Sequence, residues 1–127
     1  MPTWPDGPAT LTVGGGAAPL PLEVASSFAR RSRGLLGRAG LAGAVLLTPA
    51  QGVHTFGMRF AIDVAYLDRR LTVLAVRTMP PGRLGRPRLR ARHVLEAEGG
   101  AFAGWGVRPG VRLGVGPAPA AGGPGPD

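Results

Sequence analysis

The sequence contains no cysteine, lysine or asparagine among its 127 residues. Without cysteine the chain can form no disulfide, thiolate nucleophile or zinc–thiolate site. Its apolar runs are only a few residues long, far below the roughly 20 that cross a bilayer, so we expect no transmembrane segment. The start, MPTWPDGPAT, has neither the basic region nor the apolar core of a secretory signal. We therefore expect a cytoplasmic protein.

The basic residues are all arginine. These 15 arginines outnumber the seven acidic residues and give a formal net charge of +8. A surplus of this size favours contact with phosphate or with another anionic partner. The abundance of Ala, Gly and Pro, together with a single isoleucine at Ile62, is also typical of a GC-rich bacterial coding sequence. The arginine excess therefore has two explanations, an anionic partner and codon usage.

The chain is short enough for one hydrophobic core, so we predict a single β-rich domain over residues 9–115. Residues 1–8 are expected to form a flexible N-terminus. Residues 116–127, GPAPAAGGPGPD, have no large apolar side chain to bury, and we expect a disordered tail there.

Short β-type runs alternate with turn signals along the domain, which predicts a mainly β (α+β) fold. Glycines at 14–16 indicate a hairpin between the first two runs. A helix is predicted over 26–38, capped by Ser26 or Ser27, and a shorter one within 99–110, closed by Gly106. The expected strands are residues 9–13, 21–25, 43–49, 53–60 with a continuation to 66, 71–77, 93–98 and 111–115.

The stretch HTFGMRFAID, residues 54–63, combines an apolar pattern with three ionisable side chains. If residues 53–60 are extended, alternation places His54 on the same face as Phe56, Met58 and Phe60, and places Arg59 on the other face. The pattern then predicts that His54 lies among core residues. It leaves open whether His54 is a hydrogen-bonded structural group or part of a site.

Several separated motifs occur in an order that resembles a known family. They are RSRGLLGR with Arg33-Gly34-Leu35, VHTFGMRFAIDVAYLD, LTVLAVRTMPPGR and ARHVLEAEGGAFAGWGVRPG. They are similar, over about residues 20–115, to the bacterial and archaeal proteins called domain of unknown function 192. The resemblance implies a compact, largely antiparallel, barrel-like sheet with two short helices, and no established activity. Because His93 falls outside the family pattern, no shared function rests on it.

The sequence offers little for catalysis or for a cofactor. Serine occurs only at 26, 27 and 32, there is no nucleophile elbow, and no Walker-type or dinucleotide loop is present. His54 and His93 with a carboxylate could imitate a metal-binding triad, but no HxH or HxxxH spacing brings them together. We expect neither an enzyme nor a cofactor or metal site.

A non-enzymatic module that binds a small polar or anionic ligand is the favoured hypothesis. Polar groups set among aromatic and glycine residues are typical of such a pocket. Two arginines could each donate a pair of hydrogen bonds to a carboxylate or phosphate. The alternative is an internal salt bridge that joins Arg59 or Arg33 to Asp63 or Glu96. The ligand-binding candidates are His54, Arg59, Asp63, Arg33 and Glu96.

A second hypothesis is binding of a polyanion or an acidic partner through the loop GRPRLRAR. In an extended segment its four alternating arginines would point the same way and, with Arg83, form a basic ridge. A solvated arginine loop is the alternative. No aromatic residue interleaves with these arginines, so base stacking is not provided and sequence-specific nucleic-acid binding is not expected. The candidates are Arg83, Arg86, Arg88, Arg90 and Arg92.

Overall fold

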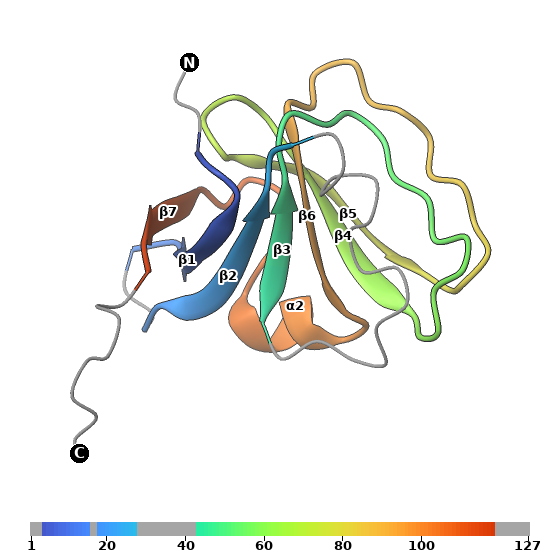
Figure 1. The fold of residues 1–127 in the computed structure, drawn as a ribbon, viewed down its shortest axis with the longest axis horizontal. Helices are drawn as coiled ribbons and strands as arrows, with labels where there is room; N and C mark the ends of the chain where they lie inside the picture. Colours follow the sequence, from blue (N-terminus) through green and yellow to red (C-terminus); the bar gives the residue numbers. More distant parts are fainter. Residues whose placement is uncertain (1–3, 16–17, 28–42, 119–127) are drawn as a thin grey trace.

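The computed structural model describes residues 4–15, 18–27 and 43–118 (Figure 1). No helix in these ranges is long and apolar enough to cross a membrane. The elements, in chain order, are β1 (Gly7–Val13), β2 (Leu20–Ala25), β3 (Ala44–Leu47), β4 (Ile62–Leu67), β5 (Val73–Met79), β6 (His93–Glu98), α2 (Ala101–Trp105) and β7 (Leu113–Pro117).

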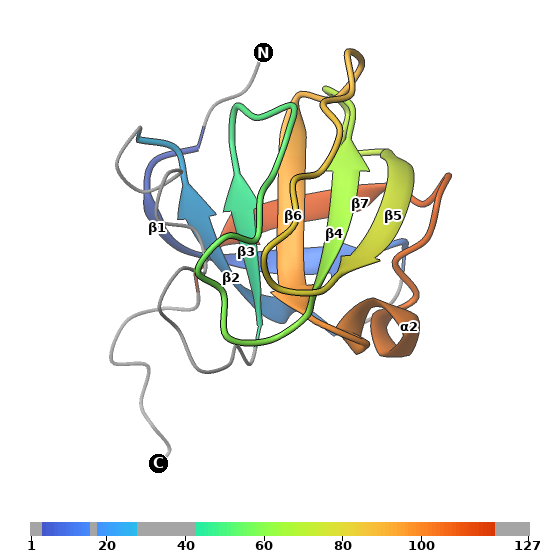
Figure 2. The ribbon, with the colours of Figure 1, turned by 90° about the vertical axis from the view of Figure 1, so that its right-hand side faces the viewer.

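The strands form one sheet in the order β5-β4-β6-β3-β2-β1-β7. Only β2 and β3 pair in parallel among these neighbours. The sheet curls into a half-barrel, as Figures 1 and 2 show. Its edges approach each other where the Leu113 N–H donates to the Leu71 carbonyl at 2.9 Å. The mainly β, largely antiparallel and barrel-like architecture predicted from the sequence is confirmed.

The predicted turn signals are found in part. β1 and β2 pair antiparallel, which confirms the predicted hairpin pairing. Helix α2 ends at Gly106, whose φ of 78° suits a residue without a Cβ. The other predicted helix, over 26–38, lies almost entirely outside the described residues. The sheet extends slightly beyond the range 9–115, because β1 begins at Gly7 and β7 runs to Pro117.

Strand β6 is buried on both faces, so its side chains alternate between two apolar clusters. Leu95 belongs to the inner cluster, which draws on strands from both edges of the sheet and on Phe102 of α2. Val94 belongs to the outer cluster, with Tyr66 of β4. Each residue of the central strands therefore faces either the inside of the curl or the covered outer face.

Two long loops cover the outer face and run side by side (Figures 1 and 2). We call residues 48–61 and 80–92 the paired loops. Backbone hydrogen bonds join them along their length: Ala50 N–H to Arg92 O at 2.9 Å, Arg88 N–H to Gln51 O at 2.9 Å, Gly85 N–H to Val53 O at 2.8 Å and Thr55 N–H to Arg83 O at 2.7 Å.

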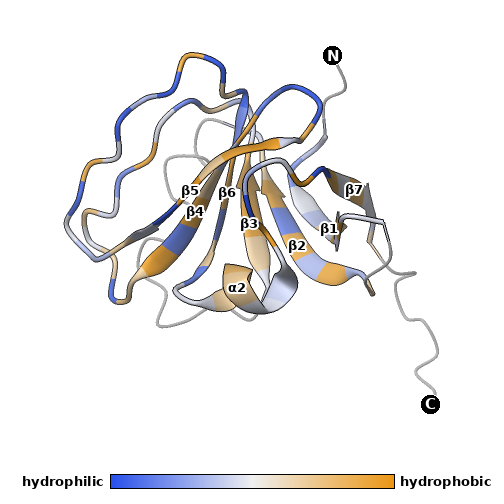
Figure 3. Ribbon diagram, turned by 180° about the vertical axis from the view of Figure 1, so that it is seen from behind, coloured by the Kyte–Doolittle hydropathy of each residue, from blue (hydrophilic) through white to orange (hydrophobic). Residues whose placement is uncertain are grey.

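The predicted strand over 53–60 is wrong, because these residues turn inside the first paired loop. The Met58 N–H donates to the Thr55 carbonyl at 3.1 Å, and Gly57 has a φ of 79°. Glycine permits this backbone conformation and ends the alternation. Figure 3 shows that hydrophilic positions recur along the paired loops while the strands are mainly apolar.

Candidate anion-binding site

A cavity of about 460 Å³ opens between the second paired loop and the β4–β5 edge of the sheet. We call it the Tyr66 cavity. Its wall contains four arginines and no acidic residue, so the potential inside it is positive. The lining residues are Tyr66, Arg77, Thr78, Met79, Pro80, Arg83, Leu84, Gly85, Arg86 and Arg88.

The centre of this cavity is an arginine held against an aromatic ring. The Arg88 guanidinium carbon lies 4.9 Å from the centroid of the Tyr66 ring, which is the geometry of a cation–π contact. Arg88 Nε is buried and has no hydrogen-bond partner within the described residues. The Tyr66 side chain is only 1% exposed, and its burial raises the pKa of the hydroxyl, which therefore stays neutral. The guanidinium is thus fixed in place with a donor unused.

The second paired loop packs closely against Tyr66 at Gly85. A Cβ added at Gly85 would lie 2.8 Å from the Tyr66 hydroxyl oxygen and 3.0 Å from Val53 Cγ1. Any side chain at position 85 would therefore push the loop away from β4. Glycine at this position allows the loop backbone to approach Tyr66.

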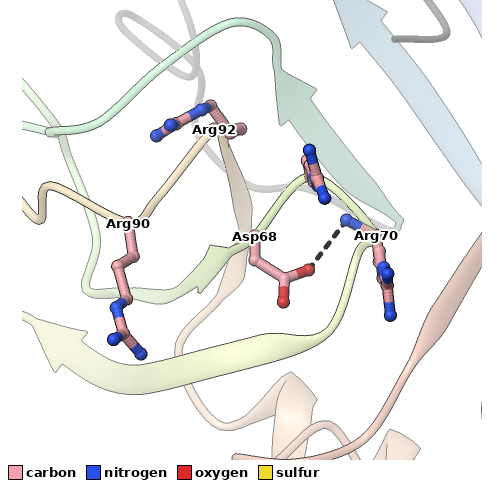
Figure 4. Close-up of a pocket in the computed structure, with 5 residues that line it drawn as sticks. Asp68, Arg70, Arg90 and Arg92 are labelled. Carbon is pink, nitrogen blue, oxygen red and sulfur yellow. Dashed lines mark hydrogen bonds between the residues drawn. The ribbon is translucent and has the colours of Figure 1, made fainter.

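A second cavity, of about 490 Å³, lies at the turn after β4. We call it the Asp68 cavity; Asp68, Arg69, Arg70, Arg90 and Arg92 line it. Asp68 Oδ1 accepts the backbone N–H groups of Arg70 at 2.8 Å and Thr72 at 2.9 Å, so this carboxylate stabilises the turn. Figure 4 shows Arg70 and Arg90 on opposite sides of Asp68, with guanidinium groups that do not converge on its carboxylate.

Together the two cavities concentrate the positive charge of the protein. Eight of the 11 arginines within the described residues line them, against one of the six acidic residues there. Codon usage, one of the two explanations of the arginine excess, would not by itself gather the positive charge around two cavities.

The arginines predicted as one basic ridge divide between these cavities. Arg83, Arg86 and Arg88 line the Tyr66 cavity, whereas Arg90 and Arg92 line the Asp68 cavity. The prediction that they point the same way is wrong, because the chain turns after Arg88. The Ala91 N–H donates to the Arg88 carbonyl at 3.0 Å, which closes a turn and breaks the alternation.

The structure separates the predicted ligand-binding residues. His54 and Arg59 are both exposed in the first paired loop, so the prediction that His54 lies among core residues is wrong. His54 forms an isolated β-bridge with Leu84, and its ring stacks on Phe56 with centroids 5.2 Å apart. Arg33 lies outside the described residues.

Asp63 is buried on the inner face of the sheet, where it accepts three hydrogen bonds. Its Oδ1 accepts from the Thr78 hydroxyl at 2.7 Å, and its Oδ2 accepts from the backbone N–H groups of Gly100 and Phe102, each at 3.0 Å. The carboxylate thus satisfies donors at the start of α2 from a neighbouring strand. Within the described residues its partners are these groups and not Arg59, so the alternative of an Arg59–Asp63 salt bridge is not found, and Arg33 lies outside the described residues.

Glu96 lies on the outer face of β6, paired in register with Val45 and Val64. It is 1% exposed, and its Oε1 has no hydrogen-bond partner within the described residues. Burial raises the pKa of this carboxyl to about 7. His93 precedes Val94 in β6 and faces the inner side of the sheet. Its Nδ1 is 2.7 Å from the Thr48 hydroxyl oxygen.

The sequence reasoning missed Tyr66 and Arg77 as site residues. Both lie in strands that the pattern identified, but only the fold shows that β5 and the second paired loop enclose one cavity. A signal was available in the run from Arg77 to Arg83, where two arginines flank the turn MPPG. Such a turn brings flanking residues close together.

Comparison with known proteins agrees with this fold. Residues 9–115 match the family model DUF192, described as "Uncharacterized ACR". UPF0127 protein PH1112 of Pyrococcus horikoshii is 32% identical over 84 residues, which are 62% of this chain and 73% of that protein.

Two crystal structures share the fold at low sequence identity. A protein of unknown function from Novosphingobium aromaticivorans has a TM-score of 0.70 at 20% identity, with 84% of each chain covered. A protein from Sinorhizobium meliloti 1021, described as a candidate transcription regulator, has a TM-score of 0.74 at 19% identity, with 90% of this chain and 98% of that chain covered. Since the family model spans most of the chain, this protein belongs to the domain of unknown function 192 family.

Proposed function

We propose that this domain is a non-enzymatic module that binds a small anionic ligand, such as a phosphate or carboxylate compound, in the Tyr66 cavity. The observation that carries the proposal is the enclosure of one cavity by Arg77, Arg83, Arg86 and Arg88 with no acidic residue in its wall. Arginine suits this task because its planar guanidinium presents several donors that match the oxygens of a phosphate or carboxylate.

The chemistry of the cavity supports binding over catalysis. Arginine stays protonated at any physiological pH, and burial raises the pKa of the Tyr66 hydroxyl, so neither group can take a proton near neutral pH. Thr78 offers a hydroxyl, but that hydroxyl donates to Asp63. The described wall therefore supplies hydrogen-bond donors and positive charge without a general base beside a nucleophile.

The Tyr66 cavity is a better candidate than the slightly larger Asp68 cavity. Asp68 places a negative charge inside the latter, and the Arg92 guanidinium already donates to the carbonyls of Leu89 at 2.9 Å and Ala91 at 3.1 Å. Arg88, in contrast, packs over the Tyr66 ring, and no carboxylate lines the cavity beside it. The site for an anion in the Tyr66 cavity is therefore preorganised, which lowers the entropic cost of binding.

The test is calorimetric titration of the protein with inorganic pyrophosphate at low ionic strength. Arg88→Gln should weaken binding roughly tenfold or more, since a hydrogen bond to a charged group contributes about 1.5–3 kcal/mol. The matched control is Arg108→Gln, which removes the same charge from an exposed arginine that lines neither cavity. Equal affinities of the two variants, or no binding by the wild type, would contradict the proposal.

A second candidate is a longer polyanion or an acidic partner that contacts both cavities. The arrangement of Arg86 and Arg88 in one cavity and Arg90 and Arg92 in the next supports it, because the two hollows adjoin along one loop. Affinity for such a partner should fall steeply as salt is raised, since each phosphate contact releases a condensed counterion. Arg90→Gln should weaken this binding while sparing pyrophosphate.

A further inference from the structure

We propose that the ligand of the Tyr66 cavity carries a planar heteroaromatic ring beside its phosphate, and that Phe56 and His54 form the surface on which this ring stacks. The inference rests on the proposed anion binding and adds the class of ligand. Nucleotides and single-stranded nucleic acid share this chemistry.

Pairing of the two loops places His54 opposite a residue of the cavity wall. His54 is the β-bridge partner of Leu84, and Leu84 is part of the cavity wall. Residues paired across an antiparallel bridge project their side chains to the same side. His54 therefore projects to the same side of the paired loops as Leu84, with the Phe56 ring stacked on it, although the two segments are about 30 residues apart in sequence.

Thr55 fixes the position of this aromatic pair. Its hydroxyl is fully buried, donates to the Pro80 carbonyl at 2.7 Å and accepts the Arg83 N–H at 2.8 Å. The Thr55 backbone N–H donates to the Arg83 carbonyl at 2.7 Å. Phe56 and the cavity residue Arg83 are thus attached to the same residue, so the fold sets the distance between their backbones.

Phe56 has the exposure that a stacking surface needs. Its side chain is 50% exposed, although phenylalanine is ordinarily buried. Its ring is oriented by the His54 ring, at an interplanar angle of 22°, and its backbone N–H donates to His54 Nδ1 at 3.3 Å. A base stacked on an aromatic side chain gains affinity that corresponds to about tenfold per ring. The fold therefore supplies the aromatic group that the local sequence around the arginines lacks.

The test compares two probes that differ only in the base, AMP and ribose 5-phosphate, by calorimetric titration. Wild type should bind AMP about tenfold more tightly than ribose 5-phosphate. Phe56→Leu keeps an apolar side chain but removes the ring, so it should abolish this preference while ribose 5-phosphate affinity stays the same. Phe56→Trp should retain the preference and shows that a ring, not phenylalanine itself, is required. Arg88→Gln should weaken both probes equally.

Different failures point to different errors. If ribose 5-phosphate, AMP and pyrophosphate all fail to bind, the proposed anion site is wrong. If the phosphates bind but AMP has no advantage, or if Phe56→Leu weakens both probes alike, the stacking proposal is overturned and the anion site stands. A comparison of thymidine 5′-phosphate with a short single-stranded oligothymidylate distinguishes a free nucleotide from single-stranded nucleic acid as the ligand. Tighter, salt-sensitive binding of the oligomer supports nucleic acid, whereas equal affinity supports a free nucleotide.

Discussion

The carboxylate of Asp63 accepts a hydrogen bond from the backbone N–H of Phe102 at 3.0 Å, and this contact ties strand β4 to helix α2. The same oxygen accepts the N–H of Gly100, so one buried group satisfies two donors at the start of the helix. Phe102 is in turn part of the inner apolar cluster. Removal of the carboxylate should therefore weaken both the hydrogen bonding at the start of α2 and the packing of Phe102 in the inner cluster.

Asp63→Ala is expected to lower the free energy of unfolding by about 3 kcal/mol, because it leaves buried N–H groups without an acceptor. Asp63→Asn should cost only about 1 kcal/mol, since the amide oxygen can accept from both N–H groups and the amide nitrogen can donate to the Thr78 hydroxyl. Urea unfolding of both variants measures the difference. If Asp63→Asn were as damaging as Asp63→Ala, a charged partner of Asp63 would have to be sought.

Gly85→Ala should destabilise the protein by about 1–3 kcal/mol, because the new methyl group would overlap the Tyr66 hydroxyl and the Val53 side chain. Tyr66→Phe removes the hydroxyl oxygen and should recover part of this loss in the double variant. The coupling is read from a double-mutant cycle of unfolding free energies. Strictly additive effects would show that the loop relaxes away from Tyr66 without penalty.

The sheet could be predicted from the sequence, because strand burial depends on local alternation and on turn residues. Strand β6 has the predicted bounds of 93–98, and Gly106 ends its helix as predicted. The stretch from His54 to Phe60 could not be predicted in this way. Its alternation is that of a strand, but Gly57 and the pairing with residues 80–92 make it a loop.

The candidate site was less predictable than the fold, because its members meet only through long-range contacts. The alternation of arginines indicated positive charge but did not show that Arg88 packs on Tyr66 while Arg90 faces another cavity. The exposure of Phe56 likewise depends on a long-range contact. A side chain with a core-like sequence context is held at the surface by a partner loop about 30 residues away.

The contribution of Glu96 to stability should fall as the pH rises from about 4.5 to about 7, because burial raises the pKa of this carboxyl from 4.5 to about 7. In this interval the folded state keeps a proton that the unfolded state has lost. The slope is at most ~1.4 kcal/mol per pH unit, or about 3 kcal/mol over the whole interval. Glu96→Gln, which resembles the protonated form, should remove this part of the pH dependence.

The measurement is urea unfolding of wild type and Glu96→Gln at a mildly acidic and a mildly alkaline pH. The variant should be similar to wild type at the acidic pH and more stable at the alkaline pH. Glu98→Gln is the matched control, because Glu98 lies on the same face of the same strand but is exposed. A pH profile of Glu96→Gln that parallels the wild type would show that Glu96 does not carry this effect.

Thr55→Val should lower stability by about 1–3 kcal/mol, because it removes the hydroxyl that joins the paired loops and leaves the Arg83 N–H without this acceptor. Thr55→Ser keeps the hydroxyl and should retain most of that stability. If Thr55 also positions Phe56 against the Tyr66 cavity, Thr55→Val should reduce the preference for AMP over ribose 5-phosphate at a temperature where the variant is still folded. Since Val and Thr have similar shapes, a Val variant that loses stability but keeps the full AMP preference would show that the ring surface is positioned by the backbone pairing of the loops and not by the hydroxyl.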